Sequence, residues 1–287
     1  MVVFDDVLLI ELDTDARVSW RYQTSELGNN SMPLPFGLPR ICCPGPGKCQ
    51  KRGTEFTFTI SDGRSRQLYG YVKQMYQRDE TTQVACILGS KPLYVWFAWI
   101  LRLVHARLLH DPSKTTTIAL LNAIRSTRTD LTKEFAFNDS FVGEMKMYKF
   151  PLHPLGELGV RALEPHILNY RSFTNKLQSP SVLLVLLSSM LFEQRIILVH
   201  EENDLLSGIC QLLLRLIAPF VWKHLLIPVL PKELLHYATA QIPFILGMTP
   251  NLYSENASKL TNVIVLHLES GKIEFLQLTV SFPTLCE

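Results

Sequence analysis

Residues 180–248 decide the fold, and they read PSVLLVLLSSMLFEQRIILVHEENDLLSGICQLLLRLIAPFVWKHLLIPVLPKELLHYATAQIPFILGM. Apolar blocks long enough for helices alternate with short apolar runs, of which 195–199 is rich in β-branched residues, as is typical of strands buried on both faces. The predicted helices are 181–192, 205–218 and 231–237, and the predicted strands are 195–199, 225–227 and 244–246. This alternation predicts a layered α/β domain.

Local signals mark the ends of these elements. Asn203 or Asp204 is placed to cap the second helix, and Pro219 ends it. Pro228 and Pro231 bracket the next turn, and Pro231 can open a short helix because its fixed φ suits a first helical position. The prolines therefore support the predicted order of helix and strand.

The remainder of the chain shows shorter elements. Strands are predicted at 2–12, 84–88 and 146–152, hairpins at 55–72 and 262–278, helices at 93–109 and 115–126, and an irregular loop at 27–53. The first hairpin has Asp62-Gly63 in its turn region, and the second turns around Ser270-Gly271. Strands followed by a long helix predict a small antiparallel sheet covered by helices in the first half of the chain.

Bulk composition excludes several classes of protein. The 287 residues carry a net charge of only +2, so no polyanionic partner is implied for the chain as a whole. The start of the chain has no signal-peptide pattern, and Glu193 and Arg195 interrupt the best candidate membrane span. The six cysteines lack a second ligand pair at zinc-site spacing and are expected to be free thiols. A cytoplasmic, soluble protein follows, with peripheral membrane association as a further expectation.

Charge is nevertheless concentrated in residues 40–78, where eight basic residues stand against Glu55 and Asp62. Two interpretations remain open. The stretch is either a solvated hairpin surface or a basic face that binds an anionic membrane surface or another acidic partner. Nucleic acid is not an expected partner, because the overall charge is nearly balanced.

Reactive motifs are missing from the sequence. It contains no Gly-rich phosphate loop and no nucleophile elbow, and its eight histidines are scattered. Glu193 and Arg195 interrupt a buried run, so either Glu193 is a catalytic carboxylate or both charges are paired, with each other or with other elements. Trp222 and His224 are expected in the core and at a strand end. No catalytic residue, cofactor or metal is therefore predicted.

The order of these residues resembles the DENN-domain family. The resemblance rests on Leu-Phe-Glu-Gln-Arg-Ile-Ile-Leu-Val at 191–199, on Pro-Phe-x-Trp-x-His at 219–224, on Ile-Pro-x-Leu-Pro at 227–231 and on Pro-Phe-x-x-Gly at 243–247. Ile41-Cys42-Cys43-Pro44 looks like an element of the family's upstream region, as do 58–60 and 68–71. The matching positions with a framework role are Glu193, Arg195, Pro219, Trp222, His224, Pro228, Pro231, Pro243 and Gly247.

The resemblance implies a fold and a function. It implies an upstream longin-like lobe at residues 1–135 and a central DENN lobe at 136–287. It also implies a guanine-nucleotide exchange factor for a Rab-family small GTPase in membrane trafficking, which binds the GTPase switch regions at a surface spanning both lobes. Such a regulator needs no catalytic residues of its own. The contact residues are not predicted.

One departure from the family pattern supports a different function. The family's Val-x-Asp-Leu-Asp appears here as Val265-Leu266-His267-Leu268-Glu269, and no downstream DENN region follows in the sequence. These features favour the alternative of a DENN-fold scaffold or adaptor, which binds a small GTPase or a partner DENN protein without exchanging its nucleotide. A polyanion binder that uses residues 40–78 is a third hypothesis.

Overall fold

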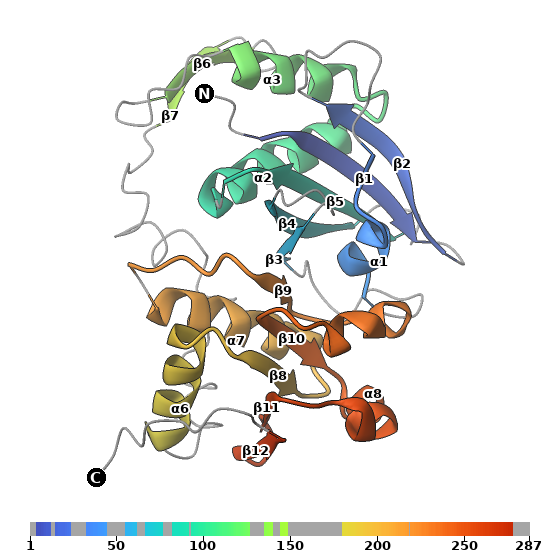
Figure 1. The fold of residues 1–287 in the computed structure, drawn as a ribbon. Coiled ribbons are helices and arrows are strands. Elements are labelled where there is room, and N and C mark those ends of the chain that lie inside the picture. The colour runs from blue at the N-terminus through green and yellow to red at the C-terminus, as the bar shows by residue number, and fades with distance from the viewer. Residues whose placement is uncertain are drawn as a thin grey trace. The chain divides into compact units, whose positions relative to one another are not determined.

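The computed structural model describes residues 4–12, 15–23, 33–44, 55–61, 67–76, 82–91, 93–126, 135–139, 144–148, 180–217 and 219–277. The chain divides into two compact units (Figure 1). Unit 1 comprises residues 1–55 and 62–162, and unit 2 comprises residues 56–61 and 163–287. A short segment from the first quarter of the chain therefore belongs to unit 2.

Unit 1 contains an antiparallel sheet of order β4-β5-β1-β2. Its strands are β1 (Asp6–Leu12), β2 (Ala16–Gln23), β4 (Gln67–Tyr76) and β5 (Thr82–Gly89). The four consecutive residues from Val7 to Ile10 are 0% exposed, so both faces of β1 are covered. In the register of β1 and β5, Leu8 lies opposite Cys86. A central strand buried on both faces explains the continuous apolar run in the sequence.

Helices cover this sheet. They are α1 (Leu38–Cys42), α2 (Tyr94–His110) and α3 (Thr115–Ser126). Helix α2 packs on β4 and β5, and α3 packs against α2. The buried side chains of α2 include Phe97, Ile100, Leu101 and Val104, which have the spacing of one helix face. Strands β6 (Phe135–Asp139) and β7 (Glu144–Tyr148) form a separate antiparallel pair, and β6 contacts α3.

Unit 2 is built on a mixed sheet of order β12-β11-β8-β10-β9-β3. Its strands are β3 (Glu55–Ser61), β8 (Arg195–Val199), β9 (Leu225–Ile227), β10 (Phe244–Met248), β11 (Val263–His267) and β12 (Lys272–Leu276). The inner strands β11, β8, β10 and β9 are parallel, while β12 and β3 join them antiparallel. Every residue of β8, β9 and β10 is buried.

The helices of unit 2 are α6 (Pro180–Leu191), α7 (Asn203–Leu216), the 3-10 helix η1 (Lys232–Thr239), α8 (Pro250–Asn256) and the 3-10 helix η2 (Ala257–Lys259). Helices α6 and α7 contact each other, α6 contacts β8, and α7 contacts β10 (Figure 1). Leu206, Ile209, Cys210 and Leu213 form the buried face of α7. They share one apolar cluster with Ile196 and other alternate residues of the parallel strands. This packing is a layered α/β arrangement, as predicted.

Most predicted elements are confirmed, and the differences are local. Helix α7 begins at Asn203, so Asn203 is inside the helix and does not cap it. The predicted loop at 27–53 contains the short helix α1, and strand β2 was not predicted. Strand β6 was not predicted either, and β7 begins and ends earlier than the predicted strand.

The α/β fold class is confirmed, while two finer predictions are left open. The division of the chain between residues 135 and 136 stays a prediction, as does the longin-like character of the first lobe. Both strands of the predicted hairpin at 55–72 are present as β3 and β4, and the predicted turn at Asp62-Gly63 lies outside the described residues.

Candidate functional site

Five of the nine motif residues of unit 2 gather at one edge of its sheet. Arg195 begins β8, His224 directly precedes β9, and Pro243 directly precedes β10. Because these strands are parallel neighbours, their amino ends meet at the same edge, which we call the amino edge. Glu193 and Trp222 lie in the segments that lead into β8 and β9. Residues far apart in the sequence are therefore brought together there.

Arg195 forms hydrogen bonds that connect the segments at this edge. Its side chain is buried, its Nε donates to the carbonyl of Asn262, and its Nη1 donates to the carbonyl of Ala240, each over 3.0 Å. Burial lowers the pKa of Arg195 from its ordinary value. The two carbonyl groups belong to the segments before β11 and β10, so one guanidinium ties three strand entrances together. The predicted charge pairing is therefore resolved: Arg195 pairs with other elements and not with Glu193.

Glu193 is held by a different partner. Its Oε1 lies 3.0 Å from Nε2 of His224, and this contact links the segments that precede β8 and β9. Glu193 has a φ of 52°, in a turn where its amide donates to the carbonyl of Met190 and thereby closes the end of α6. This exposed carboxylate faces a histidine and lies in a turn. Its geometry therefore describes a link between two segments.

Trp222 packs against His224. The two rings meet edge to face with centroids 5.1 Å apart, and the indole Nε1 donates to the carbonyl of Leu225 over 3.3 Å. Trp222 is buried, while His224 is partly exposed. The prediction that these two residues lie in the core and at a strand end is consistent with this geometry.

The remaining motif residues shape the backbone. A Cβ atom at Gly247 would lie 1.8 Å from the carbonyl oxygen of Pro228, so only glycine fits there. Pro231 has extended geometry directly before η1, and Pro219 is exposed after the end of α7. The close contact at Gly247 is a packing requirement, while the framework role of the other motif positions stays a prediction.

The amino edge also exposes apolar side chains that the sequence analysis did not identify. They are Leu191 (58% exposed), Phe192 (53%), Phe220 (66%), Val221 (39%) and Ile242 (51%), which we call the amino-edge patch. Leu191 ends α6, and the other four lie in the segments that lead into β8, β9 and β10. The sequence signal was available, because Phe220 belongs to the Pro-Phe-x-Trp motif, but its exposure depends on the fold.

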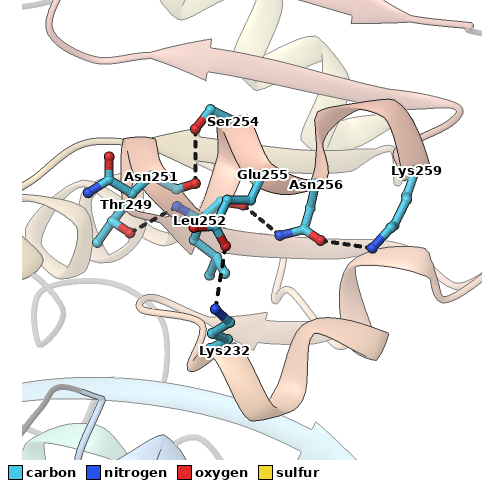
Figure 2. Close-up of polar contacts among 8 residues, drawn as sticks. All are labelled: Lys232, Thr249, Asn251, Leu252, Ser254, Glu255, Asn256 and Lys259. Carbon is cyan, nitrogen blue, oxygen red and sulfur yellow. Dashed lines mark hydrogen bonds and ion pairs between the residues drawn. The ribbon is translucent and has the colours of Figure 1, made fainter.

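The opposite, carboxyl edge of the sheet is polar. After β10, Thr249 Oγ1 accepts from the amide of Leu252 over 3.5 Å and caps α8, and Asn256 Nδ2 donates to the Leu252 carbonyl over 2.9 Å (Figure 2). Lys259 donates to Asn256, and the exposed ends of Lys232 and Glu255 meet 3.5 Å apart. Figure 2 shows that these polar groups are directed at one another, so they stabilise α8 and η2 locally.

A buried histidine joins two loops at the carboxyl edge. His200 Nδ1 accepts from the amide of Glu202 over 2.9 Å, so its Nε2 carries the proton that faces the Glu269 carboxylate 3.1 Å away. Glu201, Glu202 and Glu269 are all exposed here. Open α/β sheets commonly bind phosphate groups at the carboxyl edge. Here the negative carboxylates would repel a phosphate group. The geometry therefore offers more to a protein partner at the apolar amino edge.

Comparison with known proteins identifies the family. A family model described as the DENN (AEX-3) domain matches residues 80–271. The chain belongs to the DENN family. The match contains all nine framework positions of unit 2, and the upstream residues 41–71 lie before it.

Relatives of this DENN chain are distant. DENN domain-containing protein 1B of Mus musculus is 25% identical over 281 residues, covering 94% of this chain and 34% of the relative. The human protein of the same name is 25% identical over 292 residues, covering 94% of this chain and 36% of the relative. Human DENN domain-containing protein 2A is 34% identical over 83 residues, covering 28% of this chain and 8% of the relative. The chain spans about a third of the length of the 1B relatives.

The departure from the DENN pattern at His267 has a structural setting. His267 ends β11, its Nε2 lies 3.4 Å from Glu274 Oε1, and its ring meets Tyr253 edge to face. Glu274 accepts from Lys272 and from the hydroxyl of Tyr253, each over 2.8 Å. The hydrogen bond from Lys272, followed by the one from Tyr253, lowers the pKa of Glu274 to about 2. A histidine is accommodated here because a carboxylate on β12 faces it.

The structure of this DENN protein describes two of the eight basic residues in the stretch 40–78. Arg40 pairs with Asp15 over 2.5 Å, and Lys73 pairs with Glu55, which also accepts from the hydroxyl of Tyr71. The other six basic residues of 40–78 lie outside the described residues. Both described cations are engaged within unit 1, so membrane binding by this stretch stays a prediction.

Membrane-spanning helices and clusters of metal ligands are both absent from the described residues. Within the described ranges, no helix is both long and apolar enough to cross a bilayer. In the same ranges, no three His, Cys, Asp or Glu side chains come together as metal ligands would. The structure describes four cysteines, which are buried and form no disulfide: Cys42, Cys43, Cys86 and Cys210.

Proposed function

We propose that this DENN chain is a guanine-nucleotide exchange factor for a Rab-family small GTPase in membrane trafficking. The family match over residues 80–271 carries the proposal, because DENN proteins act generally on Rab GTPases. The relatives from which this function is transferred are about 25% identical. The proposed place of action is the cytoplasmic side of membranes, with peripheral association.

The chemistry of exchange suits a protein without reactive groups. An exchange factor binds the nucleotide-free GTPase more tightly than the nucleotide-bound form, and this difference in affinity displaces the switch loops from Mg²⁺ and phosphate. The chain would act as a regulator of an enzyme and contribute no acid, base or nucleophile. The proposed contact surface draws on both lobes, and the fastened amino edge of unit 2 supplies one rigid part of the scaffold.

A GDP-release assay tests the proposal. Rab proteins loaded with a fluorescent GDP are mixed with the 287-residue chain and excess GTP, and the loss of fluorescence is followed. We expect at least about a tenfold faster release from one Rab or a small group, which corresponds to about 1.4 kcal/mol of selective stabilisation. An Arf-family GTPase serves as a specificity control. Unchanged release across the complete Rab set of the host would overturn the proposal.

The scaffold or adaptor alternative is favoured by one observation, which is His267 at the position where the family pattern carries Asp. An adaptor would bind a GTP-loaded GTPase or a partner DENN protein and leave the GDP release rate unchanged. Calorimetric titration of the chain with GTP-loaded and nucleotide-free Rab separates the two functions. Tighter binding to the nucleotide-free form supports exchange, and tighter binding to the GTP form supports the adaptor.

A further inference from the structure

The amino-edge patch combines exposed apolar side chains from three segments of unit 2. Phe192 and Phe220 are 53% and 66% exposed, and Ile242 is 51% exposed. The 3.0 Å contact between Glu193 and His224 joins the first two segments directly. Large apolar side chains gathered in this way on a polar surface mark sites of protein interaction.

The patch is held in place before any partner arrives. Arg195 fixes the carbonyl of Ala240 at the entrance to β10, and Trp222 anchors the segment that follows Phe220 in the core. The amide of Phe192 donates to the carbonyl of Ser188 and continues the hydrogen-bonding of α6. A preorganised surface loses little conformational entropy on binding, and aromatic side chains contribute most of the binding energy in such surfaces.

The dimensions of the patch fit one helix. The segments precede three neighbouring parallel strands, which span roughly 10 Å across the sheet at the usual strand spacing. An α-helix with its side chains is about 10 Å wide and presents apolar residues at i, i+3 or i+4 and i+7. An added strand does not fit, because β8 and β10 are already paired on both sides.

Charge specifies the partner further. Lys223 is exposed beside the patch and forms no ion pair among the residues that the structure describes. The carboxylate of Glu193 is already engaged by His224. A carboxylate on the incoming segment would therefore face Lys223 without competition.

We propose that the amino-edge patch docks an amphipathic α-helix of a protein partner, with an acidic residue of that helix opposite Lys223. This interaction is independent of nucleotide exchange.

Selection from a peptide library tests the docking site. The 287-residue chain is used to select from displayed 14-residue helical peptides, after depletion on the Phe192→Ser/Phe220→Ser double variant. We expect enriched sequences with apolar residues at i, i+3 or i+4 and i+7 and with Asp or Glu beside them. A selection that yields no such enrichment overturns the proposal.

Matched variants then test the residues with one enriched peptide. Phe220→Ser should weaken peptide binding at least about tenfold, whereas the control Phe275→Ser, at an exposed phenylalanine on β12, should change it less than about twofold. Lys223→Glu should weaken the acidic peptide and strengthen its Lys-substituted counterpart. Equal effects of the two Phe variants, or no charge preference at position 223, contradict the proposal.

Two other occupants are distinguished by parallel measurements. If Phe220→Ser abolishes a concentration-dependent dimer of this chain, the patch is a self-association surface and the proposal is wrong. If the same variant abolishes Rab-stimulated GDP release and no peptide is enriched, the patch belongs to the GTPase contact and the proposal is also wrong. If the wild-type chain binds the peptide but does not accelerate GDP release from any Rab, only the proposed exchange function is rejected.

Discussion

The backbone of Gly247 lies directly against the carbonyl group of Pro228, and the same glycine accepts a hydrogen bond from the amide of Leu230 over 2.8 Å. The carbonyl oxygen of Pro228 would stand 1.8 Å from a Cβ atom at position 247. The two motifs that contain Pro228 and Gly247 are thereby joined by a packing requirement. Backbone atoms cannot turn aside as a side chain can, so the contact tolerates only a hydrogen atom.

Gly247→Ala is therefore expected to destabilise unit 2. Insertion of one methyl group against a fixed backbone should lower the free energy of unfolding by about 3 kcal/mol or more. Ile245→Val, at a buried position on the same strand, removes a methyl group and should cost about 1 kcal/mol. Urea unfolding followed by circular dichroism measures both values. A Gly247→Ala protein as stable as the wild type would show that the contact is not as close as described.

Arg195→Met should destabilise the protein through the carbonyl groups it leaves behind. The variant removes both donors from the carbonyls of Ala240 and Asn262, and we expect a loss of about 2 kcal/mol in the free energy of unfolding. Arg195→Lys can replace one donor and should lose less. Amide exchange near residues 240 and 262 should accelerate in both variants. As a control, Lys232→Met removes an exposed ion pair and should cost less than about 0.5 kcal/mol.

The hydrogen bond between Tyr253 and Glu274 predicts a pH dependence of stability at both ends of the scale. Hydrogen bonds from Lys272 and Tyr253 lower the pKa of Glu274 to about 2, so its contribution is present above the unfolded pKa and is lost as the pH falls towards 2. Burial and Glu274 raise the pKa of Tyr253 to about 12, so its contribution is present below the unfolded pKa and is lost as the pH rises towards 12.

Carboxylate NMR and tyrosinate absorbance measure these two pKa values directly. Tyr253→Phe should raise the pKa of Glu274, since one donor is lost, and Glu274→Gln should lower the pKa of Tyr253. The acid-dependent part of the urea midpoint should shrink in Glu274→Gln. A pKa near 4 for Glu274 in the wild-type protein is the result that would refute the described contacts.

Asp111 is expected to titrate far below an ordinary aspartate and to hold the start of α3. Its carboxylate accepts hydrogen bonds from the hydroxyl and amide of Ser113 and from the amide of Thr116. These hydrogen bonds, of which the one from the Ser113 hydroxyl has the largest effect, lower the pKa of Asp111 to about 2. Asp111→Ala should therefore accelerate amide exchange in the first turn of α3. Glu201→Gln, at an exposed carboxylate elsewhere, should leave that exchange unchanged.

The sequence predicts elements best where burial dominates their composition. Strand β8 (Arg195–Val199) and strand β9 (Leu225–Ile227) occur at the predicted residues because every position is buried, and the apolar run shows it. Strand β2 was missed because it lies at the edge of its sheet, where Arg17 is exposed and Arg21 pairs with Asp6. An edge strand needs few apolar residues, so its composition resembles that of a loop.

The amino-edge patch shows why the candidate site was harder to predict. Phe220 and Trp222 stand two residues apart in one motif, yet Phe220 is 66% exposed and Trp222 is 5% exposed. Simple alternation would place both on the same side of an extended segment. The irregular backbone before β9 separates them, and its course depends on contacts such as Trp222 with Leu225 that composition does not reveal. The burial of Trp222 agrees with the prediction, whereas the exposure of Phe220 is a property of the folded chain.

The assignment of residues 56–61 to unit 2 affects the order in which the protein can be completed on the ribosome. Thr59 of β3 pairs with Leu226 of β9, so β3 meets β9 only after about 170 more residues, or about 10 to 30 s at common synthesis rates. The nascent chain would thus hold β3 without its β9 partner for most of its synthesis.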